Sequence, residues 1–367
     1  MSGLATLSLL ALSIILHELG HYIAARKSGV AVSEFFIGFG PKIFSKKIFN
    51  TEYGVKAILL GGYVKIPGMD AEEEVTNIYE ENELYHTARW QTKLLISGSG
   101  ILVNLFLAFS ILIVVLGISG MAYPSLEIES LGGSINNETK PAAYNAGLEP
   151  GDIIYSFNGE VLESWEQLVE FIEDNPNEKV SISYLRGEKL YSTLVTLDEK
   201  VVDGESLGYL GVSPKIYNEK LTAFQITTSS FIILLNMISS SISGILTLLS
   251  PSNLVTLAGG LFGNPVPAEI RPLSPIGLAQ AGQIIGDSGF VNLLTLLAFV
   301  NVFLAIFNSI PLIPLDGGRV VLALLEGVTG KKFSDRKLYP LAAIVVLLFL
   351  FLGITALYLD LTQPIKL

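Results

Sequence analysis

The chain has 367 residues, of which 50% are hydrophobic and only 16% are charged, a composition too apolar for a soluble globular protein of this size. We therefore expect an integral membrane protein. The absence of cysteine excludes disulfides, thiolate nucleophiles and cysteine metal ligands. The net charge of −11 arises in one stretch, because residues 122–220 hold 18 acidic and 7 basic residues and the remainder balances. Such an acidic surface argues against nucleic-acid binding.

Four hydrophobic segments have the length of about 20 residues that a helix needs to cross a bilayer core. A cleaved signal peptide is the alternative for the first of them. That segment has no basic leader, and its apolar run ends in ionisable groups, so we interpret it as a retained span. The four segments are Ser2–Ala25, Leu94–Ser119, Phe290–Leu312 and Leu338–Leu359.

Basic residues indicate which side of the membrane each connecting segment occupies, since they favour the cytoplasm. One group lies between the first two spans and another between the last two. We therefore expect 26–93 and 319–337 to be cytoplasmic, and the N-terminus and the acidic domain to be extracytoplasmic. The basic residues are Arg26, Lys27, Lys42, Lys46, Lys47, Arg89 and Lys93 in the first group, and Arg319, Lys331, Lys332, Arg336 and Lys337 in the second.

A fifth apolar stretch, Leu221–Leu249, has no charged residue and is ambiguous. With the orientation above, the span from Phe290 runs from outside to inside, which leaves no net crossing for this stretch. Polar residues recur in it at helical spacing, and the pattern favours an interfacial or groove-lining amphipathic helix. These residues are Gln225, Ser229, Asn236, Ser240, Ser243 and Thr247.

Two regions outside the spans have strand-like patterns. Tyr53–Gly68 is rich in β-branched and aromatic residues and is interrupted by Gly61 and Gly62, which predicts a short hairpin. The acidic region contains the runs "DIIYSFNG" and "KVSISYLRG" around an amphipathic helix, "SWEQLVEFIEDN". Ser164 is the expected N-cap of that helix, with Gln167 at the capping-box position. At roughly 90 residues, this region is one small α+β domain.

The first span ends in "HELGH", in which His17 and His21 stand four residues apart and share one helix face. This H-E-x-x-H spacing is a zinc-protease signature, in which Glu18 takes a proton from water and later delivers it to the leaving amine. Coincidence would have to explain why two of only three histidines lie inside a bilayer span, where polar groups are costly. The third, His86, lies apart from this motif, and we interpret it as an ordinary interfacial histidine.

Zinc needs at least one further protein ligand, and Asp316 is a candidate. From Ser288 to Leu315 the chain carries no charge, and Asp316 then follows in "FNSIPLIPLDGGRV". Pro311 and Pro314 interrupt the helix there, which a membrane tolerates only where protein or a wet cavity satisfies the backbone. Capping of the basic helix that starts near Gly318 is an equally good interpretation of Asp316 from this segment alone.

Together, the H-E-x-x-H span, the "NSIPLIPLDGG" segment and the domain between them resemble the site-2 protease family of intramembrane zinc metalloproteases, in its PDZ-containing bacterial and archaeal branch. The resemblance covers nearly the whole chain. It implies that His17, His21 and Asp316 hold one Zn²⁺ per chain and that Glu18 is the general base and acid.

The resemblance also implies substrate contacts. Asn308 would help to hold the substrate backbone, and Val55–Lys65 would be the membrane-associated hairpin that pairs with an extended substrate, with contacts at Gly61, Gly62 and Tyr63. The family often carries G-P-x-x-N on the second span, whereas this chain has Gly100-Ile-Leu-Val-Asn104 without the proline. Asn104 would contact substrate, or it would only join two helices.

Tyr144–Ile172 is similar to the core of a bacterial PDZ domain, and "GYLGV" (Gly208–Val212) resembles its closing strand. The implied fold is a polytopic α-helical membrane protein with a membrane-associated β-hairpin and an inserted PDZ-like domain. The expected organisation is 1–121 as the first part of the protease core, 122–215 as the PDZ-like domain, 216–289 as an amphipathic region and 290–367 as the second part of the core.

The sequence therefore predicts an endopeptidase that cleaves transmembrane segments of other membrane proteins within the lipid bilayer. A peptide or substrate tail would bind the PDZ-like domain. One alternative is a catalytically silent membrane scaffold that binds peptides through that domain, although none of the four expected zinc and catalytic residues is missing. A second is a zinc transporter, which would usually have more ionisable groups along a path through the membrane.

Overall fold

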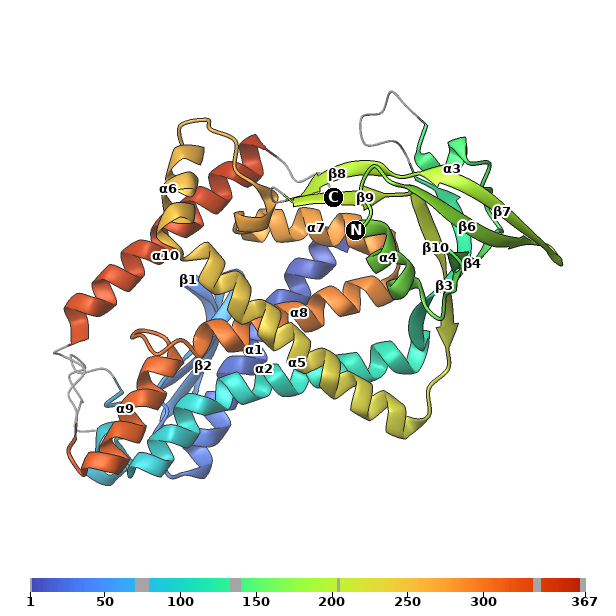
Figure 1. Ribbon diagram of the computed structural model, residues 1–367. Helices are drawn as coiled ribbons and strands as arrows, with labels where there is room; N and C mark the ends of the chain where they lie inside the picture. Colours follow the sequence, from blue (N-terminus) through green and yellow to red (C-terminus); the bar gives the residue numbers. More distant parts are fainter. Residues whose placement is uncertain (1, 70–78, 133–139, 203–204, 333–337, 364–367) are drawn as a thin grey trace. The chain divides into compact units, whose positions relative to one another are not determined.

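The computed structural model describes residues 2–69, 79–132, 140–202, 205–332 and 338–363 (Figure 1). It consists of two compact units. The membrane unit comprises Met1–Ile118 and Ala223–Leu367, and the inserted unit comprises Ser119–Thr222. Arg336 and Lys337 of the expected cytoplasmic segment lie outside the described residues.

Five helices of the membrane unit are long and apolar enough to cross a bilayer. Four of them match the expected spans with shifted ends, and the fifth, α5, adds a candidate span to the four expected from the sequence. The helix from Phe290 ends at Asn308 rather than Leu312, because Pro311 and Pro314 cannot continue it. The five helices are α1 (Ser2–Lys27), α2 (Trp90–Ser119), α5 (Ala223–Leu248), α8 (Phe290–Asn308) and α10 (Tyr339–Thr362).

The buried positions of α5 are two serines and two aliphatic residues, namely Ser230, Leu234, Ser241 and Ile245. Leu234 belongs to a buried cluster with Ala108 and Leu112 of α2 and with Ala298 and Val302 of α8. Most of the polar stripe expected from the sequence is exposed instead, namely Gln225, Asn236, Ser240, Ser243 and Thr247.

The end of α10 is joined to the start of α7 (Pro275–Asp287) by a buried ion pair. Asp360 is fully buried; its Oδ1 lies 2.9 Å from Nη2 of Arg271, and its Oδ2 accepts a hydrogen bond of 2.8 Å from the backbone N–H of Ser274. The Arg271 side chain is only 11% exposed, so its charge depends on this partner. Helix α6 (Pro251–Gly260) also packs on α10, through Leu257.

We expect Asp360→Ala to lower the free energy of unfolding by about 3–5 kcal/mol, because it leaves the Arg271 charge buried and unpaired. Denaturant unfolding of the purified protein in micelles measures the change. Asp287→Ala, at an exposed position on α7, is the matched control and should change stability by less than about 0.5 kcal/mol. Equal effects of the two substitutions would contradict the prediction.

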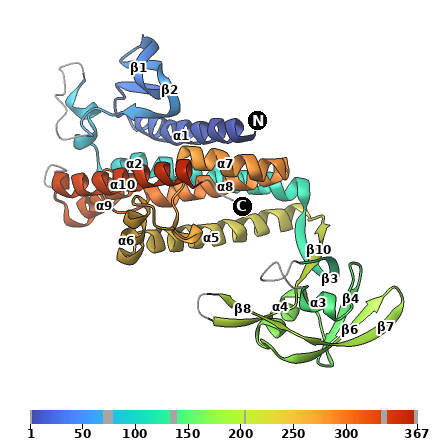
Figure 2. The same cartoon turned by 90° about the horizontal axis from the view of Figure 1, so that it is seen from above.

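The sequence predicted a hairpin within Tyr53–Gly68, and this prediction is wrong, because the segment does not pair with itself. It belongs to β2 (Thr51–Lys65), which pairs with β1 (Glu34–Ile48), so the turn lies at Phe49-Asn50 rather than at Gly61-Gly62. Residues 34–37 pair both with 62–65 and with 52–55, and the two long strands therefore fold into a small sheet. Figure 2 shows this sheet on one side of α1, with the other helices of the membrane unit on the opposite side.

The inserted unit has a β-sheet of order β10-β3-β4-β6-β7, with β5 (Glu160–Val161) beside β4, and a separate pair, β8-β9. The expected runs form β4 and β6, whereas 208–212 is not one strand but the junction of β9 and β10. The strands are β3 (Met121–Leu131), β4 (Ile153–Phe157), β6 (Lys179–Arg186), β7 (Lys189–Thr196), β8 (Asp198–Val202), β9 (Glu205–Tyr209) and β10 (Val212–Glu219).

Helix α4 (Trp165–Glu173) packs Leu168 and Ile172 into the core of this unit. Its expected N-cap is confirmed, because the Ser164 hydroxyl accepts a 3.2 Å hydrogen bond from the backbone N–H of Gln167. The short helix α3 (Ala142–Asn145) contributes two buried alanines to the same core.

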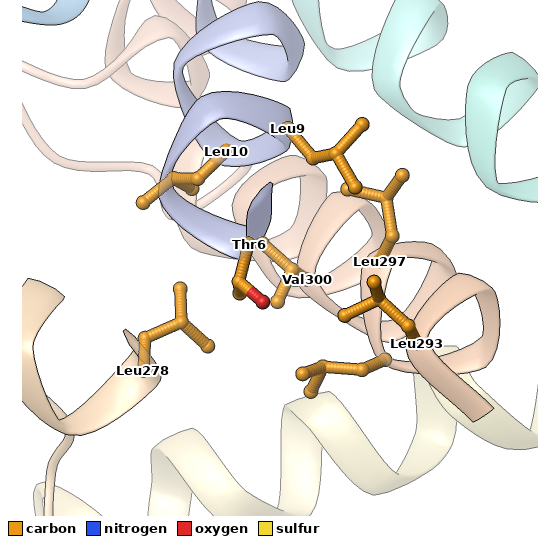
Figure 3. A pocket seen from close by; sticks show the side chains of 8 residues that line it. Thr6, Leu9, Leu10, Leu278, Leu293, Leu297 and Val300 are labelled. Carbon is orange, nitrogen blue, oxygen red and sulfur yellow. The ribbon is translucent and has the colours of Figure 1, made fainter. Parts of the chain in front are cut away.

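A small apolar cavity of about 10 Å³ lies between α1, α7 and α8 (Figure 3). Thr6, Leu278 and Leu293 line it together with further leucines and a valine. It has room for little more than one water-sized sphere, and its lining is apolar. It is therefore a packing defect between helices rather than a binding site.

Candidate metal centre

Helix α1 presents both histidines of the H-E-x-x-H motif on one face. Their side chains are nearly buried, with 8% of His17 and 6% of His21 exposed. The two Nε2 atoms lie 3.2 Å apart, so the rings point toward a common position. Gly20 allows this face to lie close to α2, because a Cβ there would lie 2.9 Å from Val103 and 3.0 Å from the carbonyl oxygen of Ser99.

Asp316 meets the two histidines from the distant part of the chain. Its Oδ2 lies 3.1 Å from Nε2 of His17 and 3.1 Å from Nε2 of His21. The capping interpretation of Asp316 is wrong, because α9 (Asp316–Thr329) begins at Asp316 itself, its N-cap is Leu315, and no side chain caps it. The Asp316 carboxylate is directed at the imidazoles instead. The irregular segment that contains Pro311 and Pro314 carries the chain from α8 to this position.

The glycines after Asp316 are required by close backbone packing. A Cβ at Gly317 would lie 2.2 Å from the carbonyl oxygen of Ser309, and one at Gly318 would lie 2.7 Å from the backbone of Leu312 and Ile313. Real Cβ atoms do not approach other atoms this closely. The start of α9 therefore folds back onto the preceding turn, and this holds the Asp316 carboxylate near α1.

The three side chains fit a zinc ion. The separations of their facing atoms are 3.1, 3.1 and 3.2 Å. Ligands at about 2.0–2.1 Å in a tetrahedral site are about 3.3 Å from one another, close to these values. Two imidazoles and one carboxylate also form a donor set typical of catalytic zinc, which leaves a position for water or substrate. Among the described residues, His17, His21 and Asp316 are a group of side chains close enough together to hold a metal ion.

Helix α2 leaves the space that such an ion needs. A Cβ at Gly100 would lie 2.4 Å from Nε2 of His21 and 2.6 Å from Nε2 of His17. Since a metal would lie about 2.0–2.1 Å from the same two atoms, the side chain of any other residue would intrude into its position. Gly100 thus forms a wall of the site without filling it.

The backbone of α2 also orients His21. The Nδ1 atom of this ring lies 2.7 Å from the carbonyl oxygen of Ile96. A carbonyl only accepts hydrogen bonds, so Nδ1 carries the proton and Nε2 presents a lone pair. That lone pair faces Asp316 and His17, which is the tautomer that a metal ligand requires.

Glu18 connects the centre with the β-sheet. Its Oε2 accepts a 3.1 Å hydrogen bond from the backbone N–H of Val64 in β2. Residues 62–65 pair with 34–37 on one side, and within the described residues no other strand pairs with them. Glu18 therefore occupies one N–H of a strand edge that pairs with no described strand, and it also lies beside two candidate metal ligands in the sequence.

The other expected substrate-binding residues lie in two places. Gly61, with a positive φ of 107°, approaches Ile14 of α1, and the Tyr63 hydroxyl donates to Glu34 within the sheet. Asn308 donates a hydrogen bond to the carbonyl of Leu304 on its own helix.

Asn104 is almost fully buried, at 1% exposure, and its carboxamide lies against His17 rather than at an open surface. Sequence reasoning did not identify three further contributors, which are Gly100, the Ile96 carbonyl and the Val64 N–H. Two of these are backbone groups, which no residue type reveals. For Gly100, the sequence did contain a signal: Gly100 and Asn104 are four residues apart and therefore lie on one face of α2.

Comparisons with known proteins identify related sequences over most of the chain. A family model described as "Peptidase family M50" matches residues 5–352. A Nostoc protein named as a zinc metalloprotease is 29% identical, with 99% of this chain and 96% of the relative covered. The zinc metalloprotease RasP of Bacillus licheniformis is 25% identical, with 88% and 90% covered. The chloroplastic membrane metalloprotease ARASP of Arabidopsis thaliana is 28% identical, with 96% and 77% covered.

Among solved structures, the PDZ domain of an SdrC-like protein from Listeria monocytogenes aligns with 25% of this chain and 88% of its own. The TM-score is 0.21 and the sequence identity is 19%, so this likeness carries no argument about the inserted unit.

Proposed function

The chain belongs to peptidase family M50, the site-2 protease family, and from this premise we propose that it cleaves transmembrane segments of other membrane proteins within the bilayer. Membership makes it a zinc metalloprotease, and its apolar helices make it a multi-pass membrane protein. We propose three further properties: that cleavage takes place within the bilayer, that the substrates are transmembrane segments, and that individual residues have the roles given below.

One observation carries the proposal: Asp316, the first residue of α9, meets His17 and His21 within the long apolar helix α1, where a bare cluster of ionisable groups would be costly. These residues would hold one zinc ion per chain. When bound, zinc supplies a Lewis acid that makes water more acidic and polarises a carbonyl. His21 and His17 lie six and ten residues before Lys27, so about two or three turns of α1 separate the site from the expected cytoplasmic end.

Glu18 is the general base and acid of the proposed reaction. It takes a proton from the attacking water as the water oxygen bonds to the scissile carbonyl carbon. It then delivers a proton to the leaving nitrogen as the C–N bond breaks. The Val64 N–H holds one oxygen of the Glu18 carboxylate, which leaves the other free to accept the proton. No covalent bond between enzyme and substrate forms.

The open edge at residues 62–65 would hold the substrate. A transmembrane helix must unwind before its backbone reaches the metal, and an unwound segment can add to a strand edge through backbone hydrogen bonds. A strand added at this edge would run past Val64 and therefore past Glu18. Asn308 and Tyr63 would make further contacts with the same extended substrate segment.

The remaining parts of the chain extend the proposal. The distribution of basic residues supports an orientation in which 26–93 and 319–337 would be cytoplasmic and the N-terminus and the inserted unit outside, with no net crossing by α5. The inserted unit would act as a PDZ-like domain that binds a peptide or substrate tail and so regulates access to the protease. Signalling by regulated intramembrane proteolysis would follow from such control.

The proposal predicts that purified protein binds one zinc per chain and cuts a helical transmembrane substrate inside its apolar segment. We expect His17→Ala to lose most bound zinc and to lower cleavage at least 100-fold, since one of three protein ligands is removed. Metal analysis and mass spectrometry of the products in proteoliposomes measure both. His86→Ala, which changes a histidine remote from the site, is the control and should retain zinc and activity.

Two outcomes separate the proposal from its alternatives. A silent scaffold that binds peptides through the inserted unit would show no cleavage with or without zinc. A zinc transporter would show zinc flux into liposomes that His17→Ala abolishes, with no cut in the substrate. Cleavage confined to soluble loops would retain the protease and remove the intramembrane part of the proposal.

A further inference from the structure

One face of α2 contacts both candidate histidine ligands. Ile96, Gly100 and Asn104 recur every four residues, so they lie on the same face of this helix, and all three are buried. The carbonyl oxygen of Ile96 lies 2.7 Å from Nδ1 of His21, and the carboxamide nitrogen of Asn104 lies 3.3 Å from Nδ1 of His17. Each Nε2 faces Asp316, and each Nδ1 faces α2.

The proton on Nδ1 decides whether Nε2 can bind metal. A histidine that binds zinc through Nε2 carries a proton on Nδ1, and this N–H needs an acceptor. Ile96 supplies it for His21. For His17, the neighbouring atom is the amide nitrogen of Asn104, which is also a donor, while Oδ1 of Asn104 is buried without a partner in the described part of the chain.

A single rotation of the Asn104 carboxamide satisfies both groups. Oxygen and nitrogen exchange places when the amide turns by 180°, and the volume it occupies is unchanged. The oxygen then accepts the Nδ1–H of His17, and the buried oxygen is no longer unpartnered. The Gly100 backbone between the two contacts leaves room for the ion itself.

We propose that Asn104 is a positioning residue of the metal site, which accepts a hydrogen bond from Nδ1–H of His17 and thereby directs Nε2 of that ring at zinc. This inference rests on the proposed zinc site of His17, His21 and Asp316. It differs from the substrate contact expected from the sequence, because the Asn104 side chain contacts His17 and is only 1% exposed.

The chain contains a matched case of an asparagine that only joins helices. Asn301 of α8 is fully buried, and its Nδ2 donates a 3.0 Å hydrogen bond to the Ser13 hydroxyl of α1. Its Oδ1 also has no partner among the described residues. Ser13 lies one turn before His17 on α1, so Asn301 stabilises the same helix nearby without a hydrogen bond to either histidine.

The experiment compares Asn104→Leu, Asn104→Asp and Asn301→Leu in the full-length protein in micelles. Zinc affinity is measured by competition with a chromophoric chelator. We expect Asn104→Leu to weaken zinc binding about 10–100-fold, the usual effect of removing such a partner. Asn104→Asp should stay close to wild type because its carboxylate also accepts the hydrogen bond, and Asn301→Leu should stay close because it touches no ligand.

Cobalt supplies a readout that is independent of activity. The visible absorption bands of the Co²⁺-loaded protein report ligand geometry, and we expect them to shift in Asn104→Leu but not in Asn301→Leu. Unfolding curves of the metal-free proteins give the stability of each variant separately from its metal affinity.

Four results would overturn the inference. Equal loss of zinc affinity in Asn104→Leu and Asn301→Leu would show that helix contact alone matters. A loss in Asn104→Asp as large as in Asn104→Leu would exclude the hydrogen-bond acceptor. Unchanged affinity in Asn104→Leu would overturn the inference and leave the proposed function intact, whereas absence of zinc from the wild type would overturn both.

Discussion

Replacing Glu18 with glutamine is expected to lower the rate of peptide-bond hydrolysis by a factor of about 10²–10⁴, the usual contribution of a general acid–base group. The amide of glutamine keeps the size of the side chain and can still accept the Val64 N–H, but it cannot take a proton from water. Because Glu18 is not one of the three candidate ligands, zinc content should not change.

Single-turnover cleavage of a transmembrane substrate in proteoliposomes measures this effect, with metal analysis of the same samples. Glu269→Gln, which alters an exposed carboxylate elsewhere in the membrane unit, is the control and should retain most activity. Cleavage by Glu18→Gln at the wild-type rate would remove Glu18 from the mechanism. Loss of zinc in this variant would instead assign Glu18 a role in the metal site.

Gly100→Ala is expected to abolish zinc binding, and with it activity, although it adds only one methyl group. The added Cβ would lie 2.4 Å from Nε2 of His21 and 2.6 Å from Nε2 of His17, in the space that the ion needs. Relief would require α1 and α2 to separate, and the close approach of Gly20 to Ser99 and Val103 opposes such a movement.

Gly98→Ala is the matched control for this prediction. It lies two residues earlier on the same helix, and within the described structure no atom lies within 4 Å of a Cβ built there. Both substitutions replace glycine with alanine in a helix, which by itself is favourable by up to about 1 kcal/mol. We expect Gly98→Ala to keep zinc and activity, and equal zinc content in the two variants would contradict the assigned role of Gly100.

Together with the Asn104 variants, these substitutions separate three contributions to one site. In the proposed site, Glu18 would move protons, Gly100 would leave space for the ion, and Asn104 would set the orientation of His17. The first should change rate without zinc loss, the second should remove zinc, and the third should weaken zinc in proportion to the lost hydrogen bond. If α2 contributed only general packing in the membrane, its Gly100 and Asn104 variants would not differ in this way in zinc content.

Local patterns in the sequence predicted several parts of the molecule well. The apolar segments form helices because their length and composition allow little else in a bilayer. Ser164 caps α4 because the cap depends on atoms three residues apart. The family resemblance, and the zinc metalloprotease activity that it implies, is confirmed.

Long-range pairing was predicted less well. The sequence indicated a strand near Gly61 but placed its partner within the same segment, whereas β1 is the partner. Residues 34–48 contain Gly38, Gly40, Pro41 and three lysines, which obscure the alternation typical of a strand. A strand edge obtains its stability from hydrogen bonds to a distant segment, and residue types alone do not specify that segment.

The sequence by itself determined which groups are available for chemistry: two histidines on one turn of a helix, a glutamate between them and one aspartate in an uncharged region. The tertiary structure decided how they meet, since Asp316 lies 295 residues after His21 and is held near it by the close packing of Gly317 and Gly318. It also decided that Asn104 faces His17 and that Ile96 faces His21. Periodicity is a local property, whereas these contacts depend on backbone atoms and on the distance of closest approach between helices.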